Sequence, residues 1–265
     1  MKTRIKVKSI VSVFILFLGY CATSSAAIIA SDDFDGGALN RASYSATPNN
    51  AFNTPFPTNN NDVFGIINRT INGRFRDNSA SSGDNFGILD STKTDNVFGV
   101  QDLRNGSNPG GTGTATWVFD INNATGLSLD IDMAAMGNFE DSGNGADFFN
   151  FSISIDGAPA TQIITIVTDE STTQDYLLEG FGSPRTIADP LVANGTALSN
   201  LFQTISVDLS SFGTGSQLTL SFFANNNGNE VFAFDNIVVN GTPVPLSPSM
   251  WLLGSGLFVL GLKRR

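Results

Sequence analysis

The sequence predicts an all-β fold, built as a two-sheet β-sandwich. Several segments alternate apolar and polar residues with a period of two, which buries one face of a strand, and helical periodicity is nearly absent. The 27 Gly and 27 Asn residues supply turns, because both tolerate positive φ at low cost. The 22 Phe residues are suited to filling the space between two sheets. A chain of 265 residues is long enough to bury such a core.

The clearest strands lie in the middle of the chain. Residues 127–133 alternate Leu, Ile and Met with Ser and Asp, and residues 149–155 alternate Phe and Ile with Asn and Ser. The second of these strands leads into Asp156-Gly157, a pair typical of tight turns, and then into the apolar residues 161–168. The segments on either side of this turn therefore predict a β-hairpin.

The remaining expected strands, separated by Asn-, Gly- and Ser-rich segments, are residues 28–34, 63–67, 86–89, 97–100, 114–120, 202–209, 217–224 and 231–239. Residues 42–62 are rich in Asn, Pro and Thr and predict a long loop. No internal repeat is evident, so we expect one domain over residues 28–241.

The first 27 residues have the build of a signal peptide. A basic start precedes an apolar run over residues 10–19 and a small-residue stretch over residues 22–27. The apolar run is shorter than the roughly 20 residues of a membrane span. We expect signal peptidase to cut after Ala26 or Ala27, and the alternative is an uncleaved anchor. Cleavage there also removes Cys21, the single cysteine, so the mature protein would carry no disulfide.

The last segment, residues 242–265, predicts a second processing signal. Its features in order are the prolines Pro243, Pro245 and Pro248, an apolar stretch over residues 250–262 with Trp251 near its start, and the terminal cations Lys263, Arg264 and Arg265. As a helix the apolar stretch is about 20 Å long, shorter than the roughly 30 Å hydrocarbon core of a bilayer. The cations would stay on the cytoplasmic side. We therefore expect a short hydrophobic helix that enters the inner membrane only transiently.

The prolines, the Trp-Leu-Leu-Gly-Ser-Gly-Leu core and the basic finish together resemble a PEP-CTERM sorting signal. The resemblance covers about residues 243–265, and Pro245-Leu246-Ser247 stands where that family usually has Pro-Glu-Pro. It implies that an exosortase recognises the tail at the inner membrane of a Gram-negative bacterium, often one that makes exopolysaccharide. The enzyme then cuts near the proline motif, which implies a secreted or cell-surface protein.

Composition excludes several classes of function. The chain contains no histidine, which removes Ser-His-Asp and Cys-His nucleophiles, an imidazole base and His-ligated metals. Four of the 14 cations lie in the leader and three in the tail, so the body keeps 7 cations against 24 acids, a net charge of about −17. This acidity argues against nucleic acid as a partner.

Two acidic segments predict a calcium site. Asp33 and Asp35 lie near the start of the body, and Asp235 lies near its end. The segments around them resemble the first and last strands of carbohydrate-binding or lectin-like jelly rolls, which implies a jelly-roll-like sandwich whose end strands pair and often hold a structural Ca²⁺. The three carboxylates and nearby carbonyls would supply the hard oxygen ligands that Ca²⁺ takes. We favour the alternative interpretation, in which these side chains cap turns through side-chain to backbone hydrogen bonds.

Paired carboxylates are the main chemistry left to an enzyme without histidine. Asp130 and Asp132 lie about 7 Å apart on one strand face, within the range of a glycosidase pair. Because the alternation places them on the polar face, we interpret them as solvated. We interpret the acidic loop 138–147, which contains Glu140 and Asp147, in the same way.

Aromatic side chains on the surface would favour sugar binding. Trp117 lies among apolar neighbours and is interpreted as core, which leaves Tyr44 and Tyr176 as the other hydrogen-bonding aromatics of the body. Residues 225–229 predict an amide-rich hairpin loop, similar to loops that bind sugars.

These observations predict a non-catalytic surface or extracellular-matrix protein that is exported and sorted by its tail. The first alternative is a carbohydrate-binding module of the exopolysaccharide layer. The second alternative is a carboxylate-dependent glycosidase. We expect no cofactor other than the structural Ca²⁺.

Overall fold

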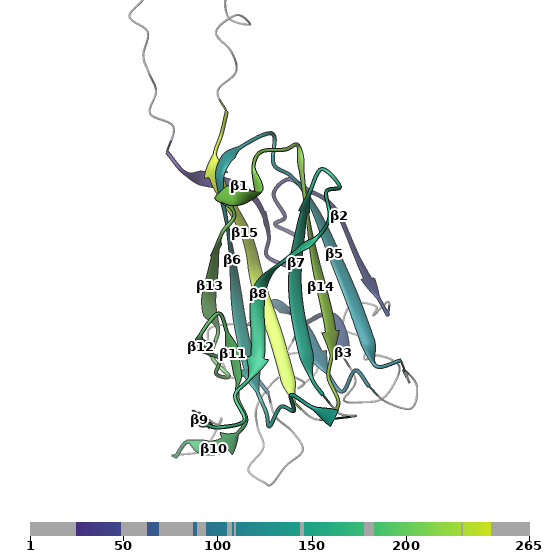
Figure 1. Ribbon diagram of the computed structural model, residues 1–265, viewed down its shortest axis with the longest axis vertical. Helices are drawn as coiled ribbons and strands as arrows, with labels where there is room; N and C mark the ends of the chain where they lie inside the picture. The colour runs from purple at the N-terminus through teal and green to yellow at the C-terminus, as the bar shows by residue number, and fades with distance from the viewer. Residues whose placement is uncertain are drawn as a thin grey trace, which may run out of the picture.

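The computed structural model describes residues 25–48, 63–68, 87–88, 94–104, 108, 110–143, 146–177, 183–228 and 230–244. These residues form two β-sheets packed face to face, with a small two-stranded sheet at one end (Figure 1). The predicted two-sheet β-sandwich is therefore confirmed.

One sheet has six strands and contains both the first and the last strand of the body. Its order is β13-β6-β15-β4-β3, with β1 also paired to β15. The strands are β1 (Ala27–Asp32), β3 (Val63–Asn68), β4 (Asn96–Gln101), β6 (Thr125–Met136), β13 (Gln203–Asp208) and β15 (Val231–Thr242). The strands β4 and β1 pair with the same side of β15: β4 with the first residues of β15, and β1 with its last residues. The pairing of the end strands that the jelly-roll resemblance implies is therefore present.

The other sheet has seven strands in the order β12-β11-β8-β7-β14-β5-β2. They are β2 (Arg41–Thr47), β5 (Thr112–Asp120), β7 (Phe148–Ile155), β8 (Thr161–Thr168), β11 (Leu191–Ala193), β12 (Thr196–Ala197) and β14 (Gln217–Asn225). The predicted hairpin is confirmed, because β7 and β8 pair antiparallel. Asp156 and Gly157 both adopt positive φ, 49° and 76°, as a tight hairpin turn requires.

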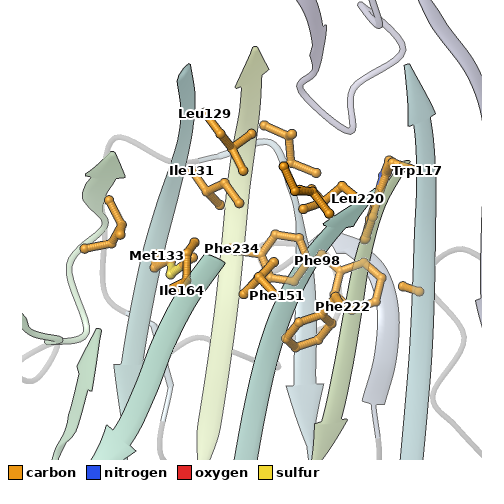
Figure 2. Packing of buried hydrophobic residues seen from close by; sticks show 14 of the residues in the cluster. Phe98, Trp117, Leu129, Ile131, Met133, Phe151, Ile164, Leu220, Phe222 and Phe234 are labelled. Carbon is orange, nitrogen blue, oxygen red and sulfur yellow. The ribbon is translucent and has the colours of Figure 1, made fainter. Parts of the chain in front are cut away.

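The core lies between the sheets and combines aromatic rings with aliphatic side chains (Figure 2). Phe98 and Phe234 of the six-stranded sheet stack at 4.8 Å between ring centroids. Phe151 and Phe222 of the seven-stranded sheet lie 4.6 Å apart, and Phe222 meets Phe234 edge to face at 5.0 Å. Trp117 is fully buried beside them, so its interpretation as a core residue is confirmed.

A second apolar cluster covers part of the outer face of the six-stranded sheet. The strands β9 (Thr173–Tyr176) and β10 (Arg185–Ala188) form the two-stranded sheet, and a short 3-10 helix, η2 (Ser210–Phe212), follows β13. Tyr176 of β9 and Ile187 of β10 are buried in this cluster with Ala134, Met136, Val231 and Ala233. Both faces of β6 and β15 are therefore covered where these residues lie.

The strand register brings three connections to one end of the sandwich, which we call the loop end. The strands β4 and β6 both end opposite Val231, where β15 begins. The strands β5 and β7 both begin opposite Asn225, where β14 ends. The connections β4–β5, β6–β7 and β14–β15 therefore meet at the loop end, at the bottom of Figure 1.

Some expected elements are wrong or incomplete. Within the predicted loop 42–62, the structure has the edge strand β2, whose Tyr44 and Ala46 face the core while its other side is polar and exposed. Residues 225–229 do not form a hairpin loop, because β14 and β15 belong to different sheets. Of the expected strand 86–89, only residues 87 and 88 are described, and neither belongs to a strand; Ile88 is buried in the second cluster.

Most of the two predicted processing signals falls outside the described residues. This applies to residues 1–24 and to the tail from Pro245 to Arg265, which includes Pro248, Trp251, Lys263 and Arg264. Among the residues that the structure does describe, no helix has the length and apolar character that crossing a membrane requires.

Candidate functional site

The outer face of the seven-stranded sheet is a broad surface of uncharged polar side chains. Alternation turns Trp117, Phe151 and Phe222 inward and their strand neighbours outward. The register aligns these outward residues in rows across the strands β2, β5, β14 and β7: one row is Ser45, Thr116, Ser221 and Ser152, and the next is Thr47, Thr114, Phe223 and Asn150. We call this surface the hydroxyl face.

A strip of apolar side chains crosses the hydroxyl face near the loop end. Phe148 of β7 and Phe223 of β14 are 37% and 40% exposed, and their ring centroids lie 5.1 Å apart. The register that pairs Asn150 with Thr165 also places Phe148 level with Val167 of β8, which is 50% exposed. Exposed apolar groups bordered by polar ones are typical of interaction sites.

The Phe148–Phe223 pair was not recognised in the sequence. In residues 149–155, the sequence pattern draws attention to the apolar side chains of the alternation, and these are buried in the structure. The same period of two places Phe148 with Asn150 and the serines of the opposite face. An aromatic residue in phase with Ser and Asn is therefore the signal that would have found it.

Four carboxyl groups gather at the loop end, and we call them the carboxyl cluster: Asp102, Glu140, Asp147 and Glu230. Asp147 is 7% exposed, and its Oδ2 accepts the Glu140 N–H at 3.1 Å while its Oδ1 accepts the Asn227 N–H at 2.9 Å. Burial raises the pKa of Asp147 to about 7, against the opposing effect of these hydrogen bonds. One side chain thus joins the β6–β7 connection to the β14–β15 connection.

Glu230 is the second buried carboxyl of the cluster, with 8% of its surface exposed. Its Oε2 is buried without a hydrogen-bond partner, as is the Oε2 of Glu140. Burial raises the pKa of Glu230 to about 8, and the negative charges of Asp147, Glu140 and Asp102 act in the same direction. The interpretation of the acidic loop 138–147 as solvated is therefore wrong for Asp147, because the β14–β15 connection covers that carboxyl.

The structure does not assemble the predicted calcium ligands. Among the described residues, no three carboxylates or other metal-binding side chains converge closely enough to hold a metal ion. Asp33 Oδ1 instead accepts the N–H groups of Asp35 and Gly37, both at 3.0 Å, and Asp235 Oδ1 accepts the Asn236 N–H at 2.7 Å. Turn capping, the alternative interpretation, accounts for these contacts.

The two carboxylates considered for glycoside hydrolysis, Asp130 and Asp132, both accept hydrogen bonds from side chains of neighbouring strands. Asp130 Oδ2 accepts Asn240 Nδ2 at 2.8 Å, and Asp132 accepts Thr204 Oγ1 at 2.6 Å and Asn236 Nδ2 at 2.8 Å. Both lie on the outer face of the six-stranded sheet. Asp130 and Asp132 are thus held by side chains of β13 and β15, on the polar face where the alternation of β6 places them.

The described residues of the two processing predictions lie at the end of the sandwich opposite the loop end. Ala26 and Ala27 are exposed, and Ala27 pairs with Gly241 near the end of β15. Pro243 lines a shallow cavity of about 260 Å³ with residues from both ends of the body, including Ile28 and Val244. The expected signal-peptide cut and the start of the proline motif are therefore neighbours in space.

Comparison with protein-family models gives no match, and comparison with curated proteins gives no match. Solved structures with a similar arrangement include the CBM22-1 xylan-binding domain of Paenibacillus barcinonensis Xyn10C, with 8% identity, 84% of this chain and 100% of that chain covered, and a TM-score of 0.32. Caldicellulosiruptor saccharolyticus CBM27-1 in complex with mannohexaose has 13% identity, 60% and 80% coverage, and a TM-score of 0.27. TmCBM61 in complex with β-1,4-galactotriose has 6% identity, 54% and 69% coverage, and a TM-score of 0.27. At these values, none of them indicates what this chain binds.

Proposed function

We propose that this chain is an exported, non-catalytic protein of the cell surface or extracellular matrix, and that its hydroxyl face binds a neutral polysaccharide. The observation that carries the proposal is the Phe148–Phe223 pair, exposed on a sheet face whose other side chains are mainly Ser, Thr and Asn.

A polysaccharide matches this surface in two respects. Sugar hydroxyls both donate and accept hydrogen bonds, as do the Ser and Thr hydroxyls of the face. The C–H faces of pyranose rings are apolar and pack against aromatic rings such as those of Phe148 and Phe223. The polymer should be neutral, because a body with a net charge of about −17 repels an anionic chain.

Export and sorting are the second part of the proposal. Signal peptidase would remove the leader, and an exosortase at the inner membrane of a Gram-negative bacterium would recognise the tail. The pairing of Ala27 with Gly241 is compatible with both cuts, because each would fall at the end of a paired strand and leave the body of the sandwich in place. While the tail is in the membrane, the loop end would point away from it.

Affinity electrophoresis tests the binding proposal. Gels would contain xylan, mannan or galactan as neutral polymers, and alginate as an anionic one. We expect at least one neutral polymer to retard the wild-type protein, and Phe223→Ala to weaken that retention at least tenfold. The control is Leu201→Ala, which truncates a side chain of similar exposure, 39%, outside the hydroxyl face.

Three results would contradict the proposal. The first is equal retention of Phe223→Ala and the wild type, and the second is no retention by any neutral polymer. The third is a stable dimer in sedimentation that Phe223→Ala dissociates, because the apolar strip would then be covered by a second copy of the chain.

A further inference from the structure

We propose that pH regulates polysaccharide binding at the hydroxyl face through the carboxyl cluster. When the cluster is protonated, the connections of the loop end stay packed against one another, which we call docked. When the cluster ionises, these connections separate and polysaccharide binding weakens. This inference rests on the proposed function and adds regulation by pH to the same binding site.

The first step is continuity between the cluster and the binding face. Asp147 directly precedes Phe148, the first residue of β7. Asn225, which pairs with Phe148, ends β14 two residues after Phe223. The hydrogen bond from the Asn227 N–H to Asp147 Oδ1 therefore links the residue that precedes β7 to the segment that follows β14, and these are the two strands that carry the aromatic pair.

The second step is the tight packing around Glu230. A methyl group added at Gly137 would lie 2.7 Å from Glu230 Cβ, and one added at Gly228 would lie 2.6 Å from Glu230 Oε2. The side chain is thus enclosed by Gly137 of the β6–β7 connection and by Gly228 of its own connection, and neither position carries a side chain. Oε2 of an ionised carboxylate in this position is shielded from the water that would solvate it.

The third step is the sign of the surrounding charges. Among the residues that the structure describes, the charged groups that act on Glu230 are Asp147 and Glu140 from the β6–β7 connection and Asp102 from the β4–β5 connection, and all three are acidic. Arg104 lies on the same β4–β5 connection, but its Nε packs over Gly111, and its backbone N–H donates to the Asn226 carbonyl. No cation of the described part of the chain thus lowers the pKa of Asp147 or Glu230.

The consequence follows from linkage. With pKa values of about 7 for Asp147 and about 8 for Glu230, both groups are neutral in the docked loops at pH 5.5 and negative at pH 8.5. Ionisation places like charges together in a buried site, so the arrangement in which the loops separate gains population. Phe148 then loses the support that holds it beside Phe223.

The test measures loop docking and binding separately on the full chain. The first readout is amide hydrogen exchange at Glu140 and Asn227, whose N–H groups donate to Asp147, corrected for the intrinsic pH dependence of exchange. The second is retention by the neutral polymer in affinity gels at pH 5.5 and pH 8.5. The variants are Glu230→Gln and, as the control, Glu170→Gln, which makes the same chemical change at an exposed carboxylate.

We expect protection of both amides and polymer retention to fall at least tenfold from pH 5.5 to pH 8.5 in the wild type and in Glu170→Gln. Both should fall at least threefold less in Glu230→Gln, because Asp147 is then the only one of the two buried carboxyls left to ionise. Protection that stays flat with pH in the wild type overturns the inference, whatever the variants do. Falling protection with constant retention overturns the link to binding. No retention at either pH refutes the proposed function. The exchange data then still decide whether protonation keeps the connections of the loop end packed together.

Discussion

Phe222 and Phe223 are neighbours in β14 that face opposite ways. Phe222 is fully buried and contacts aromatic rings of both sheets, including Phe151 at 4.6 Å and Phe234 at 5.0 Å, whereas Phe223 is 40% exposed. We predict that Phe222→Ala lowers the free energy of unfolding by about 3–5 kcal/mol, because it leaves a cavity between the sheets. Phe223→Ala should cost less than about 1 kcal/mol. Urea denaturation measures both, and equal losses would contradict the assigned directions of the two rings.

The buried carboxyls predict how stability depends on pH. A folded-state pKa above the unfolded value means that the folded protein binds more protons, so stability is lost as pH rises through the interval between the two values. For Asp147 and Glu230 the interval runs from about 4 to about 8. We predict that the free energy of unfolding falls from pH 5 to pH 8.5 and that Glu230→Gln restores about 2–4 kcal/mol at pH 8.5.

Urea denaturation at a series of pH values checks this prediction. Asp156, Asp169 and Asp208 have pKa values lowered by hydrogen bonds from nearby N–H and O–H groups. The stability that they contribute is therefore lost only as the pH falls below about 4, outside this interval. A wild-type protein that is as stable at pH 8.5 as at pH 5 would show that the two carboxyls are solvated.

At the scale of elements, β5 and β3 test how closely the two sheets pack. Gly113 of β5 faces the ring of Phe64 of β3, and a methyl group added at Gly113 would lie 2.5 Å from Phe64 Cε2. We predict that Gly113→Ala lowers the free energy of unfolding by about 1–3 kcal/mol through overpacking. Thr114→Ala, at the next and exposed position, is the control. A neutral Gly113→Ala variant would mean that the sheets are further apart than described.

Long alternating strands were predictable because one buried face gives each a period of two. β8 has the expected bounds, and β5, β6, β7 and β14 differ from theirs by at most three residues at either end. The strands β9, β10, β11 and β12 were missed because two to four residues are too few to show alternation. The edge strand β2 was missed because its polar side and its turn-forming neighbours have the composition of a loop.

The candidate site was less predictable than the fold. Asp102, Asp147 and Glu230 come from three connections far apart in the sequence, so no spacing between them signals a cluster. Their burial depends on the crossing from β14 to β15, which the sequence predicted as a hairpin. The structure does not bring the expected calcium ligands together either: Asp33 and Asp235 lie near paired strands, and their oxygens accept the backbone N–H groups of their own turns.

At the scale of the whole molecule, the two processing signals predict a mature protein without either end. Cleavage after Ala26 or Ala27 and near the proline motif would remove seven cations and leave the acidic body. Intact mass spectrometry of the protein recovered from the medium or the cell surface should give a mass below the 28.0 kDa of the full chain by both segments. A full-length chain in the cytosol would contradict export and sorting together.

The most direct test of the central claim is an amide chemical-shift map of ¹⁵N-labelled protein titrated with a short neutral oligosaccharide cut from the polymer that best retards it. We predict that the perturbed amides lie in β7, β14 and β5 around Phe148, Phe223 and Ser221, and that Phe223→Ala abolishes the shifts. Saturating shifts confined to the six-stranded sheet, or no shifts at millimolar oligosaccharide, would contradict the assignment of the hydroxyl face as the binding site.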